Sequence, residues 1–391
     1  MTTQSESAVQ VVPLVAVAAP IIASIAFVLE LTIVPVLLAE IRDSLSLDTT
    51  SLSWVFNAYA IAVAVGVLAG GWLGDTLQAS RVFQLGVALF AVGAGLVALS
   101  TDYQTLLIGR VVQGLGGGFF SPLVPILLTK ARPEFPGKIL IIWGATTGYV
   151  AAVAPLLGAP LASLVGWNSM FFVFVAFAIL ALAMSSIKSN FVEFEAPCLP
   201  NIRSLMRSNQ LWVVFGFVFC SYGCITYFLF SLPLMLAGNG FSTELIGICL
   251  CLLWLNFAVI SMLLRNIVDG KHLNTVLLSG PVLILLGFVA AYSSNHLVAQ
   301  FAAAVLLGAG FACSNAPSTQ LVLRIAPADL RACSASLDIT FARLGGVATV
   351  ALFAGLAPSL ALWGIALLCF AAFVFGWLSL RQKLTDGAVP E

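Results

Sequence analysis

The chain has 391 residues, of which 61% are hydrophobic and only 8% are charged, and its mean hydropathy is +1.10. Its 16 basic and 16 acidic residues give no net charge. Soluble domains carry about 25% charged residues, so this composition excludes a water-soluble fold and indicates a protein that spans a membrane. A spanning α-helix needs about 20 apolar residues, and a chain of this length holds about a dozen.

Twelve apolar runs are each long enough to cross a bilayer as a helix, and about twice as long as a barrel strand needs to be. The first is too long for the core of a signal peptide, so we interpret it as a retained span. The predicted spans are residues 13–39, 52–73, 82–100, 104–129, 139–163, 168–187, 211–236, 245–264, 274–293, 298–323, 334–356 and 358–380.

Basic residues fall mainly on one side of these spans. Arg42 lies on the other side, and Arg110 and Arg343 lie inside spans. Because cytoplasmic loops carry an excess of Lys and Arg, we expect a multi-pass protein of the bacterial inner (plasma) membrane with both termini cytoplasmic. The residues on the basic side are Arg81, Lys130, Arg132, Lys138, Lys188, Arg203, Arg207, Arg265, Lys271, Arg324, Arg331, Arg381 and Lys383.

A basic segment with two prolines, residues 188–210, follows the sixth span and is predicted to link an N-terminal six-helix bundle (1–187) to a C-terminal six-helix bundle (211–391). Two related bundles around a central cavity suit alternating access. The alternative to such a repeat is that the matches given next arise by chance among the common residues Gly and Leu. At an offset of 194 residues the halves match Asp75 with Asp269, Gly86 with Gly280, Leu89 with Leu283, Gly93 with Gly287, and Pro133 with Pro327.

The most specific motif runs from Leu107 to Gly118 in span four and contains Arg110, Gln113 and several glycines. An Arg inside an apolar segment costs about 2.5–3.5 kcal/mol on insertion scales, so it should face a partner or a wet cavity. This motif closely resembles one of the major facilitator superfamily (MFS). The likeness is greatest to the drug:proton antiporters, in the branch whose better-known members have fourteen spans. The resemblance implies an all-α MFS fold, here with twelve spans.

The loop between spans two and three stands in the place of the family's cytoplasmic gating motif. Gly71 and Gly74 would allow close helix contact, and Asp75 would hold a charge-assisted contact at the inner gate. Arg81 completes the match, while Gln78 and its neighbours depart from the family pattern.

Span five carries Pro155, Gly158 and Pro160 where antiporters of the family usually have a Gly-Pro and a Gly-Gly pair. Ala replaces one Gly of each pair, and helix kinks that shape the bundle are the alternative role for these residues. Asp269, the repeat counterpart of Asp75, joins the predicted gating residues.

Span one contains Glu30, followed by Thr32 and Pro35, and resembles the family motif in which an acidic residue precedes Thr. Glu30 lies about 14 Å, and Arg110 about 9 Å, from the same membrane face, so we expect them to touch. Our hypothesis is a proton-coupling site in which Glu30 alternates between a proton-bound form and a form linked to Arg110 or substrate. A fixed structural ion pair is the alternative.

Polar and aromatic residues inside spans are candidates for the cavity lining, with interhelical hydrogen bonding as the alternative. Asp338 lies four residues into span eleven, where the helix dipole would stabilise an anion. The lining candidates are Asn57, Tyr59, Gln113, Tyr222, Tyr227, Asn315 and Arg343.

The two Gly-Lys pairs lack the sequence of an ATP-binding loop, and the two histidines lie in loops on opposite sides. We therefore expect no enzyme activity, cofactor, metal or nucleic-acid partner. The resemblance implies a monomeric secondary transporter, an antiporter that uses the proton gradient for efflux of drugs or small amphipathic metabolites and so gives multidrug resistance. The alternatives are a dedicated metabolite, siderophore or nutrient transporter, working as exporter or importer, and a membrane scaffold or membrane enzyme.

Overall fold

The computed structural model describes residues 14–186, 208–264, 272–327 and 331–386, and its regular structure within these ranges is helical. Twelve helices or helix pairs of the described chain are long and apolar enough to cross a membrane, with α4 and α5 together forming the fourth. The predicted all-α fold with twelve spans is confirmed. The helices are α1 (Leu14–Ser44), α2 (Thr49–Thr76), α3 (Ala79–Ala98), α4 (Tyr103–Phe120), α5 (Leu123–Ala131), α6 (Pro136–Val165), α7 (Trp167–Ser186), α9 (Asn209–Gly238), α10 (Thr243–Leu264), α11 (Leu273–Ser293), α12 (Leu297–Ile325), α13 (Arg331–Phe353) and α14 (Pro358–Asp386).

Several helices differ from the predicted spans at their ends. The predicted span 104–129 is two helices, because Pro122 between α4 and α5 has no N–H to continue the ladder. The helix α2 begins earlier than predicted, since the Asp48 side chain caps it by accepting a hydrogen bond from the Ser51 N–H at 2.8 Å. Hydrogen bonds from Ser51 also lower the pKa of Asp48. Apolar runs therefore underestimate the length of a helix that begins at a polar capping residue.

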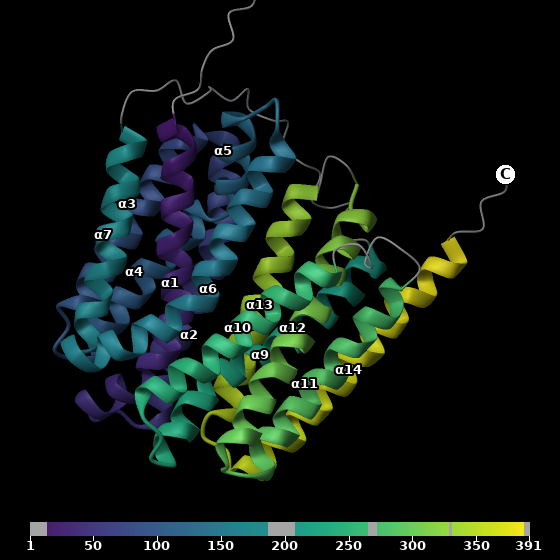
Figure 1. The fold of residues 1–391 in the computed structure, drawn as a ribbon. Helices are drawn as coiled ribbons and strands as arrows, with labels where there is room; N and C mark the ends of the chain where they lie inside the picture. The colour runs from purple at the N-terminus through teal and green to yellow at the C-terminus, as the bar shows by residue number, and fades with distance from the viewer. Residues whose placement is uncertain (1–13, 187–207, 265–271, 328–330, 387–391) are drawn as a thin grey trace, which may run out of the picture.

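Helices α1–α7 form one bundle and α9–α14 the other, and the two lie side by side (Figure 1). The end at which α1 begins is here called the basic end, because Arg81, Lys130, Arg324 and Arg381 lie on helix ends there. The end at which α1 stops is called the far end. The bundles meet at the far end and diverge toward the basic end (Figure 1). Most of the predicted linker 188–210 lies outside the described residues.

Equivalent glycines pack equivalent helices in the two bundles. A Cβ atom at Gly116 of α4 would lie 2.5 Å from the Gly86 carbonyl oxygen of α3, and one at Gly310 of α12 would lie 3.0 Å from the Gly280 carbonyl oxygen of α11. Both pairs are related by the offset of 194 residues. Close backbone approach through small residues, common in membrane bundles, therefore recurs at matching positions in each half.

The second contact of α4 has the same counterpart. Gly114 packs on the Tyr59 carbonyl of α2, and Gly308 packs on the Leu253 carbonyl of α10, again at the same offset. The polar residues do not follow this symmetry, because the position of Arg110 is occupied by Ala304 in the second half. The scaffold is thus repeated while the charged site belongs to one bundle.

One apolar cluster of buried side chains joins the two bundles. It includes Leu37 and Ile41 of α1 and Leu236 of α9, all near the far end. The half of the C-terminal bundle nearer the basic end has a separate cluster, which includes Leu211 and Leu321. The bundles are therefore sealed against each other at the far end.

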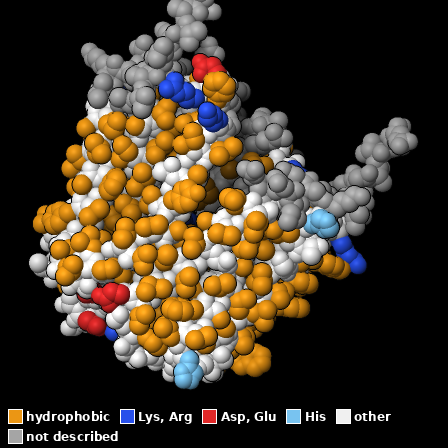
Figure 2. All heavy atoms as spheres, in the orientation of Figure 1, with side chains coloured by type: hydrophobic (Ala, Val, Ile, Leu, Met, Phe, Trp, Pro, Cys, Tyr) orange, Lys and Arg blue, Asp and Glu red, His pale blue; other side chains and the backbone are white. Residues whose placement is uncertain are grey.

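The flank of the molecule is mostly apolar, with charged side chains gathered toward its ends (Figure 2). Large apolar side chains are exposed on the outer helices, among them Trp363, Leu367 and Phe370 of α14, at 66–76% exposure. An exposed apolar surface of this extent is stable in lipid rather than in water.

Replacing Gly116 by Ala tests the packing between α3 and α4. The new Cβ would lie 2.2 Å from the Phe90 nitrogen, so we expect the free energy of unfolding to fall by about 1–3 kcal/mol. Gly148→Ala on α6 is the matched control, since a Cβ there meets nothing within 4 Å and Ala is the better helix former. Unfolding of both purified variants in detergent measures the difference, and equal stabilities would contradict the packing argument.

Candidate functional site

The centre of the N-terminal bundle contains a buried ion pair. Arg110 Nη1 of α4 lies 2.6 Å from Glu30 Oε1 of α1, and each side chain is only 2% exposed. Removing two charges from water is costly, and attraction alone offsets this only with good geometry and further hydrogen bonds. The other contacts of Arg110 are therefore part of the site.

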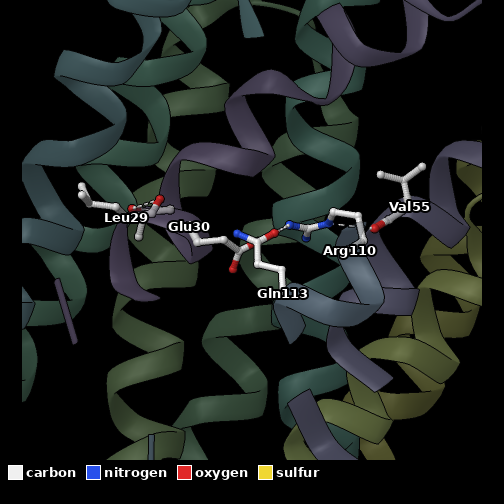
Figure 3. Close-up of polar contacts among 6 residues, drawn as sticks. Leu29, Glu30, Val55, Arg110 and Gln113 are labelled. Carbon is white, nitrogen blue, oxygen red and sulfur yellow. Dashed lines mark hydrogen bonds and ion pairs between the residues drawn. The ribbon is translucent and has the colours of Figure 1, made fainter. Parts of the chain in front are cut away.

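Arg110 has three further partners on α2 and α4. Its Nε donates to the Val55 carbonyl at 3.2 Å, its Nη1 donates to Gln113 Oε1 at 2.9 Å, and its guanidinium lies 4.2 Å from the centre of the Tyr59 ring. Figure 3 shows the guanidinium lying between Glu30 and Val55. A guanidinium over an aromatic face adds a cation–π attraction, which is stronger when desolvated.

The site retains unused hydrogen-bonding capacity. Among the described residues, Glu30 Oε2 and Gln113 Nε2 are buried without a hydrogen-bond partner. Buried polar atoms are nearly always satisfied by protein or water, so Glu30 Oε2 marks where a proton or a hydrogen-bond donor would bind, and Gln113 Nε2 marks where a water molecule or a ligand acceptor would bind.

The helix ends correct the predicted depths. Because α1 continues to Ser44 rather than ending near residue 39, Glu30 lies about 21 Å from the far end of its helix, not 14 Å. Arg110 lies about 10 Å from the start of α4. The two meet because α1 extends beyond the start of α4, so the predicted contact is present although one depth was wrong.

A cavity adjoins the ion pair where the two bundles face each other. It contains about 480 Å3 of empty space, part of it open to solvent. Its polar lining is Glu30, Tyr59, Arg110, Thr226 and Arg343. Its apolar lining is Leu31, Val34, Pro35, Phe56, Ala60 and Leu229.

Three of the predicted residues beyond the ion pair belong to this site. Tyr59 and Arg343 line the cavity, and Gln113 contacts Arg110. Sequence reasoning missed Phe56 and Thr226. Thr226 carried the usable signal of a polar residue inside a span, whereas Phe56 is one of 28 phenylalanines and had none.

The other predicted lining residues lie outside the cavity lining and make hydrogen bonds between helices. Asn57 donates to the Val347 carbonyl across the two bundles at 3.3 Å, and Tyr227 donates to the Phe353 carbonyl at 3.3 Å. Tyr222 donates to the Asn315 side chain. Asn57, Tyr222, Tyr227 and Asn315 therefore make the interhelical hydrogen bonds that were the alternative to a place in the lining, and Asn57 Oδ1 remains buried without a partner among the described residues.

The predicted gating residues of the first half lie at the basic end. A Cβ at Gly71 of α2 would lie 3.6 Å from the Ser336 hydroxyl of α13, so the two bundles come close there. Gly74 packs on Leu123 of α5, and Arg81 is exposed. The Asp75 side chain and all of Asp269 lie outside the described residues, so their predicted contacts stay predictions.

Pro155 and Gly158 lie in the half of α6 nearer the far end. A Cβ at Gly247 of α10 would lie 2.6 Å from the Pro155 carbonyl oxygen, and one at Gly158 would lie 3.1 Å from Ile33 of α1. This small-residue stretch therefore packs α6 tightly against α1 and against the other bundle, where the bundles are sealed.

Asp338 is placed differently from its prediction. The helix α13 begins at Arg331, seven residues before it, so Asp338 lies beyond the first turn, where the dipole acts. Its side chain is buried and accepts a hydrogen bond from Thr319 of α12 at 3.2 Å. Its surroundings are those of an interhelical contact.

Removing one partner of the ion pair should destabilise the protein more than removing both. Glu30→Leu leaves an uncompensated buried guanidinium, so we expect the free energy of unfolding to fall by about 3–5 kcal/mol. Adding Arg110→Leu removes that charge and should recover most of the loss. Unfolding of the single and double variants by detergent titration checks this, and additive losses would show that the two groups are not coupled.

Comparison with known proteins places the chain in a family. The model of the Major Facilitator Superfamily matches residues 21–350. The Methylenomycin A resistance protein of Bacillus subtilis (strain 168) is 32% identical over 160 residues, which are 39% of this chain and 34% of that protein. The Tetracenomycin C resistance and export protein of Streptomyces glaucescens is 34% identical over 157 residues, 39% of this chain and 29% of that protein. The matched part is thus about a third of these relatives' length.

Solved structures show the same fold at low sequence identity. A mutant of the nucleoside transporter NupG has a TM-score of 0.69 at 13% identity, covering 94% of this chain and 99% of that one. The D-xylose-proton symporter has a TM-score of 0.73 at 15% identity, covering 93% and 97%. With twelve spans and a family match over most of its length, the chain belongs to the Major Facilitator Superfamily, a family of membrane transporters rather than enzymes.

Proposed function

We propose that the chain is a secondary transporter that exports drugs or small amphipathic metabolites in exchange for protons. The observation that supports it is the buried Glu30–Arg110 pair at the edge of a cavity between the bundles. An intramembrane ionisable residue is expensive and marks an ion or substrate pathway. The relatives named for resistance to methylenomycin A and for export of tetracenomycin C support the direction and the cargo class.

Glu30 has the geometry needed to exchange a proton for another interaction. When ionised, it accepts a charge-assisted hydrogen bond from Arg110, while its second oxygen remains free among the described groups. When protonated, it loses the attraction to Arg110, whose guanidinium keeps Val55, Gln113 and Tyr59 as partners. A proton therefore removes the charge that compensates Arg110, and the guanidinium is then held by these three neutral partners alone.

The arrangement of the bundles supports alternating access. The apolar cluster and the close approach of Gly247 to Pro155 seal the far end. If the basic end faces the cytoplasm, the structure is closed toward the outside. Export then requires the far end to part and the rest of the basic end to close beside the existing approach of α2 and α13 at Gly71.

We also propose that the protein lies in the bacterial inner membrane as a monomer, with both termini cytoplasmic and no cofactor besides the proton gradient. The excess of Lys and Arg at the basic end supports this orientation.

Glu30→Gln should abolish proton-driven transport. Gln retains an acceptor for Arg110 but cannot release a proton, so it resembles the permanently protonated form. We expect wild-type protein to lower accumulation of methylenomycin A, tetracenomycin C or another compound of a drug panel in bacteria without their own pumps, and the variant to give background accumulation. In proteoliposomes with an internal pH dye, cargo should move protons for wild type only.

Glu134→Gln is the matched control, because this carboxyl is exposed in a loop at the basic end. It should transport as wild type does. Undiminished proton-driven flux in Glu30→Gln would refute the coupling role, and accumulation that rises with the gene would show import instead of export.

Reporter fusions test the orientation. A fluorescent protein joined to the C-terminus should fluoresce, and alkaline phosphatase at the same place should be inactive, because the former folds in the cytoplasm and the latter outside it. A phosphatase fusion after Ser46, between α1 and α2, should be active. The opposite pattern would reverse the proposed topology and, with it, the side to which the structure is closed.

A further inference from the structure

Among the described residues, Arg343 is the one charged side chain of the second bundle that lines the cavity. It projects from α13, is half-buried, and lines the same space as Glu30 and Arg110. Among the described residues it forms no ion pair, whereas Arg110 is bound to Glu30. Asp338, on the same helix, has its own hydrogen bond from Thr319.

The cavity therefore has an excess of positive charge. With Glu30 ionised and paired to Arg110, Arg343 leaves a formal charge of one positive unit among the lining residues. A cation at membrane depth is costly unless it meets water or an anion. A cationic ligand would have to overcome this charge, while an anionic ligand would neutralise it.

The remaining walls suit the apolar part of a ligand. Phe56 and Leu229 lie on opposite bundles, and Val34 and Pro35 belong to the same lining. Thr226 adds a hydroxyl on α9. A ligand that places one charged group on Arg343 and an apolar body against these side chains would contact both bundles at once.

We propose that the substrate is an amphipathic anion whose carboxylate binds Arg343. This rests on the transport function proposed above and names its substrate class. The planar guanidinium fork of Arg matches a carboxylate with two parallel hydrogen bonds. With Glu30 ionised, the cavity loaded with a monoanion carries no net charge, so the membrane potential does not oppose its outward step.

Three probes with the same ring system but different charges test whether binding depends on the charge of the ligand or on its shape. These are naphthalene-1-acetate, naphthalene-1-acetamide and 2-(naphthalen-1-yl)ethylamine, which are anionic, neutral and cationic at neutral pH. Equilibrium binding of the tritiated probes is measured on the purified protein in nanodiscs. We expect wild type to bind the acetate at least about tenfold more tightly than either other probe, as a charge-assisted hydrogen bond implies.

Arg343→Gln should remove this preference while leaving the affinity for the amide within about twofold, because only the anion uses the charge. Arg343→Lys should keep part of it, since Lys retains the charge but not the fork. Arg381→Gln is the matched control, an exposed arginine at the basic end of α14, and should bind as wild type does. Unchanged amide binding shows that the variants are folded.

The proposal is overturned if wild type fails to bind the acetate in preference to the other probes, or if Arg343→Gln weakens all three equally. The latter would mean that Arg343 supports the protein or Glu30 rather than the ligand. Failure of the proposed function is seen separately in proteoliposomes. If the acetate moves in the same direction as protons, exchange is refuted but the anionic substrate class is kept. If protons exchange only against the amide, exchange is kept but the anionic substrate class is refuted.

Discussion

The buried ion pair between Glu30 and Arg110 determines which contacts the surrounding helices must provide. A guanidinium with 2% exposure requires partners on several sides, and these come from α1, α2 and α4 together. Three helices can meet around it because α4 is rich in glycine on the turns after Arg110. Gly114 and Gly117 let the backbone of α2 and the ring of Phe27 on α1 approach α4. The glycine motif and the arginine are thus one structural unit.

The repeated scaffold contains a site that is not repeated. Gly114 and Gly116 have counterparts in Gly308 and Gly310, which pack the equivalent helices of the second bundle against each other. At the same offset, however, Glu30 corresponds to Cys224 and Arg110 to Ala304. The packing residues are constrained equally in both halves, because each bundle must close its helices. The charged residues are needed only beside the cavity, to which the second bundle contributes Arg343.

The sequence predicted those features that depend on one helix or on a costly residue. The spans were predicted from twelve apolar runs. The ion pair was predicted from two charged residues inside spans, because a charge at membrane depth needs a partner or water. The cavity lining was less predictable, because Asn57 and Tyr222 make hydrogen bonds to other helices and the sequence does not state which way a helix is turned. Asp338 was misplaced because α13 begins in a polar stretch, before the apolar run that marked its predicted start. Helix rotation and polar helix ends were therefore the missing information.

The ion pair lies wholly within the N-terminal bundle, which limits how the proposed proton coupling would act on the two bundles. Making or breaking the bond between Glu30 and Arg110 changes no direct contact between the bundles. Among the described residues near it, Asn57 reaches the other bundle by donating to the Val347 carbonyl, and Arg343 of the other bundle lines the adjoining cavity. The far-end seal is mostly apolar, with one polar contact across the bundles in which the Ser163 hydroxyl donates to Glu244 Oε1 at 3.3 Å. Under the proposed proton coupling, protonation would act on the bundles through what fills the cavity, since Glu30 and Arg343 line that cavity from opposite bundles.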